Sequence, residues 1–296
     1  MRPWIKPVYQ AWLLACMLVA TPLMAQERIV TIDAAVTEIV FALGAGEQVV
    51  GRDTTSTYPL SVQALPDVGY MRQLTVEGIL SLNPTVVIAS SDAKPSKTLD
   101  RLAESGVRVV VVENESTLAG IERKIHDIAQ ALQLAPRAQA LIDKMTLDFN
   151  QAQAQIQQQQ AAMQRPLSAL FVLSVRNGNL SVAGQGSRAN ALLQLLGVHN
   201  PVEKQIHNYQ PLSAEAAINL DPDVILMIEQ GVSMSGGEQA VLANPVLQST
   251  RAMKGHRLLI MPNEALVFGP RVGEVMRDVA ERLKHVQSGV VRSSLD

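Results

Sequence analysis

The sequence predicts an α/β protein of two similar lobes joined by one long connecting helix. Three observations predict this fold: a motif that occurs twice, strand and helix patterns that alternate in both halves, and a long helix-forming segment between the halves. The predicted boundaries are 1–25 for a signal peptide, 26–136 for an N-terminal lobe, 137–165 for the connecting helix and 166–296 for a C-terminal lobe.

The first 25 residues have the pattern of a secretory signal peptide. Arg2 and Lys6 give a basic start, an apolar stretch follows over 11–24, and Ala25 is a small residue at the predicted cleavage site. A lipoprotein signal ending at Cys16 is the weaker alternative, because the apolar stretch continues beyond it. A membrane-spanning helix needs about 20 apolar residues, so we expect a secreted protein that is not embedded in the membrane.

Cleavage would remove both tryptophans and the only cysteine, so the mature chain could form no disulfide. It would also change the formal charge from −2 to −4, with 23 basic residues against 27 acidic ones. A mildly acidic chain without a basic stripe is a poor binder of nucleic acid, and we expect no nucleic-acid partner.

A 15-residue motif occurs twice, at 74–88 and at 212–226. Each copy predicts a short helix capped by Thr75 or Ser213, a turn at a proline and a buried strand. Positions shared by the two copies include Glu77 and Glu215, Leu82 and Leu220, Pro84 and Pro222, and Val86 and Val224. A unit of this size that is found twice predicts two similar lobes rather than a solenoid.

Strand and helix patterns alternate along the rest of the chain, as in open parallel sheets. The predicted strands lie at 29–32, 107–112, 169–173 and 257–261, and the predicted helices at 35–43, 97–104, 189–196 and 271–285. We therefore expect each lobe to be Rossmann-like, with a mostly parallel sheet.

The segment between Pro136 and Pro166 contains no glycine or internal proline and is rich in Ala, Gln, Leu and Met. These residues favour a helix, which would be roughly 40 Å long at 1.5 Å per residue. A disordered linker over the Gln-rich stretch 151–164 is the alternative.

Four segments carry a resemblance to a known family. They are Gly-Tyr-Met-Arg-Gln-Leu-Thr-Val-Glu-Gly at 69–78, Val-Ala-Gly-Gln-Gly-Ser at 182–187, Tyr-Gln-Pro-Leu-Ser-Ala-Glu at 209–215 and Phe-Gly-Pro-Arg at 268–271. Together they resemble the periplasmic haem-binding proteins of bacterial haem ABC importers. The repeated helix–proline–strand unit is shared with binders of vitamin B12 and siderophores, whereas the Gly-Tyr-Met-Arg stretch points to haem.

This resemblance implies a helical-backbone periplasmic binding protein, a monomer of the periplasm that is not an enzyme. Ferric haem would be its transported ligand, bound in the cleft between the lobes. The protein would deliver haem to an inner-membrane ABC permease dimer with its ATPase. A binder of vitamin B12 or of a ferric siderophore is the alternative.

The resemblance also implies that Tyr70 is the axial ligand of the haem iron. A phenolate is a hard anionic donor, and tyrosine ligation of haem iron is known. Without the motif, a tyrosine beside a glycine would be read as packing at the edge of a lobe.

Further haem-binding residues follow from the same resemblance. Arg72 would hydrogen-bond the phenolate or a haem propionate, and Arg271 would approach a propionate from the second lobe. For both arginines an ordinary surface charge is the alternative. Met71 would cover a porphyrin face, and Tyr209 would contribute to the haem site.

Some members of the family place a histidine after a Phe-Val-Leu-Ser stretch such as 171–174, where this chain has Val175 and Arg176. This departure argues against a second axial ligand and against two stacked haems. We expect one haem with five-coordinate iron, and His207 is a reserve ligand by its position in the motif.

Glu77 and Glu215 occupy equivalent positions of the repeat. In related binding proteins one exposed glutamate on each lobe meets an arginine pocket of each permease subunit, so the resemblance implies permease docking at these two residues. An acidic residue in the first turn also stabilises a helix by itself, which is the alternative.

The sequence gives little support for an enzyme. The dinucleotide-binding fingerprint fails after Gly44 and Gly46, and phosphate-loop, nucleophile-elbow and zinc-protease motifs do not occur. The five histidines show no close metal-binding spacing.

Overall fold

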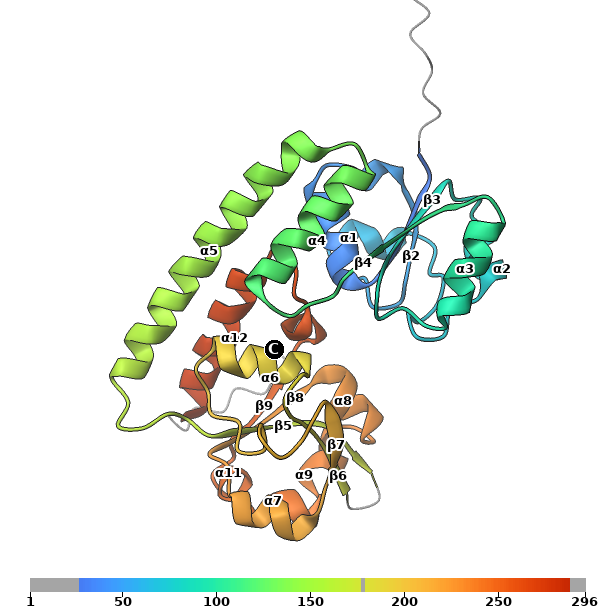
Figure 1. The fold of residues 1–296 in the computed structure, drawn as a ribbon. Helices are drawn as coiled ribbons and strands as arrows, with labels where there is room; N and C mark the ends of the chain where they lie inside the picture. Colours follow the sequence, from blue (N-terminus) through green and yellow to red (C-terminus); the bar gives the residue numbers. More distant parts are fainter. Residues whose placement is uncertain (1–26, 177–178, 288–296) are drawn as a thin grey trace, which may run out of the picture.

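The computed structural model describes residues 27–176 and 179–287, so the predicted signal peptide lies outside the described residues. Two sheets lie apart, each covered by helices, and the long helix α5 runs beside both (Figure 1). We refer to the part before α5 as the N-terminal half and to the part after it as the C-terminal half. The α/β fold with a long connecting helix is confirmed, while the predicted lobe boundaries stay predictions.

The N-terminal half contains a four-stranded parallel sheet in the order β2-β1-β3-β4. Its strands are β2 (Val49–Arg52), β1 (Ile29–Ile32), β3 (Val86–Ser90) and β4 (Arg108–Val112). One face is covered by α1 (Ala34–Ala42) and α4 (Leu118–Ala131), the other by α2 (Val76–Leu80) and α3 (Ser96–Glu104). Strands β1 and β3 are buried along their whole length, which explains their continuous apolar sequences.

The C-terminal half contains a five-stranded sheet in the order β7-β6-β5-β8-β9. Its strands are β7 (Tyr209–Leu212), β6 (Asn179–Ala183), β5 (Ala169–Arg176), β8 (Val224–Ile228) and β9 (Leu258–Met261). The pairs β5–β8 and β8–β9 are parallel, whereas β5–β6 and β6–β7 are antiparallel. The prediction of a mostly parallel sheet thus holds for the N-terminal half, and the C-terminal half adds an antiparallel edge.

Helix α5 (Ala135–Ala161) connects the halves and carries Pro136 in its first turn. Its 27 residues correspond to about 40 Å, and it ends at Ala161 rather than near 165. The buried positions repeat every three or four residues and are Ala138, Ile142, Met145, Phe149, Ala152 and Ile156. A disordered linker is therefore wrong for the Gln-rich stretch up to Ala161.

One hydrophobic core continues along α5 from the first sheet to the second. It includes Ile29 and Ile88 of the first sheet, Phe149 of α5, and Phe171 and Leu226 of the second. Helices α6 (Arg188–Leu195) and α12 (Val272–Gln287) complete this core, whereas α7 (Ala214–Leu220) covers the opposite face of the second sheet. The two halves therefore share apolar packing as well as a chain connection.

The repeated motif folds as predicted in both halves. The hydroxyl of Thr75 accepts a hydrogen bond from the N–H of Gly78, and that of Ser213 from the N–H of Ala216, both at 3.2 Å. These caps begin α2 and α7, which lead to the buried strands β3 and β8.

Shorter elements complete the described chain: η1 (Gly46–Gln48), η2 (Leu60–Ala64), α8 (Glu229–Met234), α9 (Glu238–Leu242), α10 (Pro245–Gln248), α11 (Arg251–Lys254) and η3 (Asn263–Leu266). Among the described helices, none combines the length and the apolarity that a bilayer span requires.

Candidate functional site

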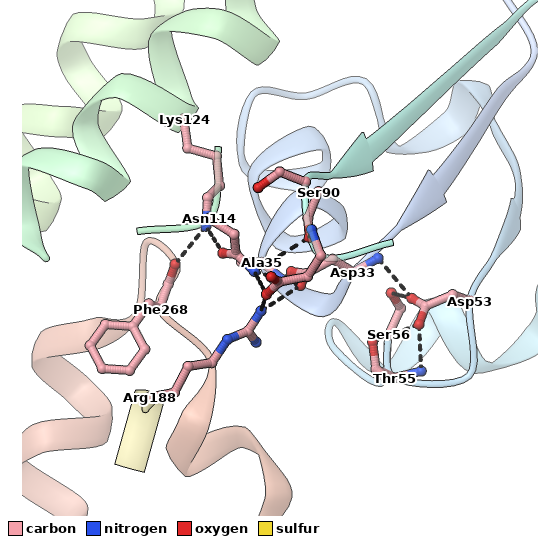
Figure 2. A network of polar contacts seen from close by, with 12 residues as sticks. Asp33, Ala35, Asp53, Thr55, Ser56, Ser90, Asn114, Lys124, Arg188 and Phe268 are labelled. Atoms are coloured by element: carbon pink, nitrogen blue, oxygen red, sulfur yellow. Dashed lines mark hydrogen bonds and ion pairs between the residues drawn. The ribbon is translucent and has the colours of Figure 1, made fainter. Parts of the chain in front are cut away.

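Polar side chains gather where the strands of the first sheet end. Asp33 follows β1, Asp92 follows β3 and Asn114 follows β4. In open parallel sheets, ligands bind at the loops that follow the carboxyl ends of the strands. Arg188, the first residue of α6, reaches the same place from the C-terminal half (Figure 2).

Arg188 joins the two halves through two ion pairs. Its Nη2 donates to Oδ2 of Asp33 at 3.1 Å and to Oδ2 of Asp92 at 2.7 Å. The side chain of Asp33 is buried, whereas those of Asp92 and Arg188 are 40% and 28% exposed. Partial burial alone would raise the pKa of Asp92, but the hydrogen bond and charge of Arg188 outweigh it, so this pKa lies below its ordinary value.

Asp33 is held from the N-terminal half as well. Its carboxylate accepts hydrogen bonds from the N–H of Ala35 at 2.8 Å and from Nδ2 of Asn114 at 3.1 Å. Its own N–H donates to buried Asp53 at 3.0 Å. The φ of Asp33 is +104°, which L residues seldom adopt, so the backbone strain of this cap lies at the site itself.

Lys124 extends the polar network into the core. It lies on α4, is 1% exposed, and donates through Nζ to Oδ1 of Asn114 at 2.5 Å and to the main-chain oxygen of Phe268 at 3.4 Å (Figure 2). Burial lowers the pKa of Lys124 to about 8, although the charge of Asp33 opposes this shift.

Tyr70, Met71 and Arg72 lie on the loop that leads to α2. The N–H of Lys94 donates to the oxygen of Met71 at 2.8 Å, and the N–H of Leu74 donates to the oxygen of Lys94 at 3.1 Å. These two bonds tie the loop to the segment that carries Asp92. The predicted haem-binding motif and the network around Arg188 are therefore neighbours.

The three consecutive residues of this motif differ in their exposure. Tyr70 is half-buried and Arg72 is exposed, while Met71 is 5% exposed and packs in the core with Leu74 and Ile79. The core position of Met71 leaves little of its side chain for a ligand, in contrast to its expected role over a porphyrin face.

Tyr209 and His207 lie at the amino end of α6. Burial raises the pKa of Tyr209, although a hydrogen bond from the backbone at Ala189 and the charges of Arg188 and Arg72 act in the opposite direction. A Cβ at Gly186 would lie 3.0 Å from Cε1 of His207, so the histidine ring rests against the loop that precedes Arg188.

Arg271 lies in a different environment. It donates to Oε1 of Glu38 on α1 at 3.0 Å, and its guanidinium lies 3.5 Å from the ring centroid of Tyr58. Burial of Glu38 raises its pKa, although the hydrogen bond from Arg271 opposes this shift. Arg271 thus already has a carboxylate partner in the N-terminal half.

The hollow beside Arg271 has a volume of about 300 Å³. Three carboxylate residues line it, namely Glu264, Glu274 and Asp278. Arg271 lines the same hollow, so its guanidinium lies among several acidic side chains.

Glu77 and Glu215 lie in the first turns of α2 and α7, and both are exposed. The repeat therefore presents one acidic side chain on each half.

Within 27–176 and 179–287, no three His, Cys, Asp or Glu residues form a group that could hold a metal ion. Arg188, Asp33, Asp92 and Lys124 were not identified from the sequence. Two signals were available, because Arg188 directly follows the quoted stretch 182–187 and Lys124 interrupts the apolar face of α4.

Two solved structures are similar over nearly their whole length. The periplasmic haem-binding protein RhuT from Roseiflexus sp. RS-1 is 32% identical, with a TM-score of 0.82 over 90% of this chain and 100% of that one. The periplasmic haem-binding protein HutB of Vibrio cholerae is 33% identical, with a TM-score of 0.73 over 90% of this chain and 100% of that one.

Two curated relatives align at lower identity. An uncharacterised ABC transporter substrate-binding lipoprotein, YvrC of Bacillus subtilis, is 26% identical over 87% of this chain and 80% of its own length. A vitamin B12-binding protein of Pectobacterium carotovorum is 22% identical over 85% of this chain and 91% of its own length.

The model of a family described as periplasmic binding proteins matches residues 29–265, which is most of the chain. This is a family of binding proteins and not of enzymes, in agreement with the absence of catalytic motifs from the sequence. The family description also indicates a location outside the cytoplasm. With its two helix-covered sheets, its long connecting helix and this match, the chain belongs to the periplasmic binding protein family.

Proposed function

We propose that this protein binds ferric haem between its two halves and delivers it to an inner-membrane ABC permease dimer with its ATPase. The observation that carries the proposal is the loop of Tyr70 and Arg72 beside Asp92, Arg188 and Tyr209. A phenol can ligate ferric iron, and guanidinium groups match the two propionates of haem. Relatives whose names state haem binding agree with this assignment.

Tyr70 is the proposed axial ligand, and Arg72 and Tyr209 are its proposed neighbours in the haem site. We propose one haem with five-coordinate iron and keep His207 as the reserve ligand. Arg271 is left out of the haem site, because its partner Glu38 is buried and would lose its cation if Arg271 turned to a ligand.

Vitamin B12 is the second candidate, because a relative carries that name. The rim of its corrin ring carries carboxamides, whereas haem carries carboxylates. Two arginines near the proposed site favour the ligand with carboxylates. We therefore rank vitamin B12 second.

A haem titration of the mature protein beside Tyr70→Phe tests the proposal. We expect saturable binding with a high-spin ferric signal in electron paramagnetic resonance, and we expect the variant to lose that signal. Saturable haem binding with an unchanged signal in the variant would move the axial ligand away from Tyr70. Binding of cyanocobalamin without binding of haem would overturn the proposed ligand.

A further inference from the structure

Asp92 is paired with Arg188 at the proposed haem site and feels the charge of a second arginine, Arg72. It accepts a hydrogen bond from Nη2 of Arg188 at 2.7 Å, and the positive charge of Arg72 contributes to lowering its pKa. A carboxylate in contact with one guanidinium and near a second is in the situation that a haem propionate would require.

We propose that Asp92 is an internal stand-in for a ligand carboxylate, and that Arg188 exchanges Asp92 for a haem propionate when haem binds. This inference rests on the proposed function. It makes Arg188 a specificity-determining residue, contributed to the haem site by the C-terminal half.

Asp92 and Asp33 differ in how easily Arg188 can leave them. Asp33 is buried, accepts from Ala35 and Asn114, and begins α1. Asp92 is 40% exposed and lies on a loop, so water can solvate its carboxylate when the bond to Arg188 breaks. Asn114 also donates to Asp92 at 3.0 Å and can keep that bond. The bond to Asp92 is therefore the exchangeable one, and the bond to Asp33 is the anchor.

The hydrogen-bond geometry of Arg188 makes a propionate a competitor of Asp92. Both of its ion-pair bonds come from the same nitrogen, Nη2. The two edges of a guanidinium that can make two parallel bonds to a carboxylate, Nε with Nη2 and Nη1 with Nη2, both include this nitrogen. When Nη2 leaves Asp92, one such edge can meet a propionate. The side chain is 28% exposed, which gives a ligand access to that edge.

The exchange also explains how the site would select its ligand. A propionate that replaces Asp92 leaves the arginine paired, so no charge becomes buried and unpaired. A neutral carboxamide cannot take the place of Asp92 in the same way, because the ion pair of Arg188 would be replaced by a weaker hydrogen bond to a neutral group. Ligands whose rim carries only amides are thus disfavoured.

Haem and haem dimethyl ester separate the roles of Arg188 and of the iron ligand, because the ester keeps the iron and has no carboxylates. We expect Arg188→Gln to weaken haem binding about tenfold or more and to leave the affinity for the ester unchanged, since a hydrogen bond to a charged group is lost. Asp92→Asn keeps the Asp33–Arg188 pair and removes the competing charge. It should strengthen haem binding by about threefold or more with no change for the ester.

Arg123→Gln is the matched control, because Arg123 pairs with Glu115 on the exposed surface of the N-terminal half. The ferric signal assigned to Tyr70 should persist in all variants, and circular dichroism reports whether each one folds. Equal effects on haem and on the ester, for both Arg188→Gln and Asp92→Asn, would overturn the inference while haem binding itself stands. A wild-type protein that does not bind haem would overturn both proposals.

Discussion

Lys124 and Phe268 join the two halves of the molecule through a hydrogen bond inside the core. The donor is Nζ on α4, the acceptor is a main-chain oxygen, and the two residues are 144 positions apart in the sequence. This bond links the halves beside the shared apolar core, as do the ion pairs of Arg188 with Asp33 and Asp92, the ion pair Arg271–Glu38 and the hydrogen bond from Thr57 to Glu264. Together they favour a limited opening of the cleft rather than a wide hinge motion.

Lys124→Met should change how stability depends on pH. The pKa of Lys124 is about 8 in the folded protein, below the 10.5 of the unfolded chain. Between these values the unfolded chain binds the proton more tightly, so the free energy of unfolding of the wild type rises with pH. We expect the free energy of unfolding of the wild type, minus that of the variant, to rise by about 3 kcal/mol from pH 7.5 to 10.5. Urea unfolding of both proteins measures this difference.

Lys97→Met is the control, because Lys97 is an exposed lysine on α3. It removes an amine of the same kind that the core does not bury, so the comparison of the two variants isolates the effect of burial. A flat difference for Lys124→Met would contradict the lowered pKa of the buried amine.

Arg271→Gln should destabilise the protein without weakening haem binding. The substitution leaves Glu38 buried without its cationic partner, which costs about 3 kcal/mol at pH 7. Burial already raises the pKa of Glu38, so the folded protein holds that proton more tightly than the unfolded chain. The contribution of Glu38 to the free energy of unfolding therefore grows as pH falls. The destabilisation caused by Arg271→Gln should be smaller at pH 5 than at pH 7.

Urea unfolding at the two pH values measures this effect, and the double variant Glu38→Gln with Arg271→Gln should recover much of the stability at pH 7. A large loss of haem affinity in Arg271→Gln would instead support the propionate role that the family resemblance implied.

Gly273→Ala should disturb the contact between α12 and α5. An added Cβ would lie 2.6 Å from the carbonyl carbon and oxygen of Asp148 and 2.7 Å from the nitrogen of Phe149. These are backbone atoms of a buried helix face and cannot move aside singly, so we expect a loss of about 2 kcal/mol. Thermal unfolding measures it, with exposed Glu281→Ala on the same helix as the control. A variant as stable as the wild type would show that the two helices can separate at no cost.

Most of the fold could be predicted from local patterns in the sequence. The motif that contains Thr75 and Ser213 predicted two helix–turn–strand units because caps, prolines and apolar runs act over a few residues. The buried stripe of α5 likewise follows from its own sequence. Helix α4 was missed, although Thr117 caps it and Ile121, Ile125 and Ile128 recur at helical spacing.

The site was less accessible from the sequence. Tyr70 and Arg72 were found through a motif, but Arg188 meets Asp33 across 155 residues and Asp92 across 96. No pattern along the chain specifies such a contact, because the fold and the position of α6 create it. Arg271 shows the converse case, in which a motif residue finds its carboxylate partner inside the protein.

Glu77→Ala and Glu215→Ala should separate haem capture from delivery. Both carboxylates are exposed in the first turns of equivalent helices, so their removal should leave haem affinity unchanged within about twofold. If they dock on the permease, each substitution removes one charged contact with one subunit, and the double variant should abolish haem-dependent growth or haem-stimulated ATP hydrolysis.

Glu104→Ala on α3 removes an exposed carboxylate outside the repeat and serves as the control. Full transport by the double variant would leave these glutamates with the local role of stabilising the amino ends of α2 and α7.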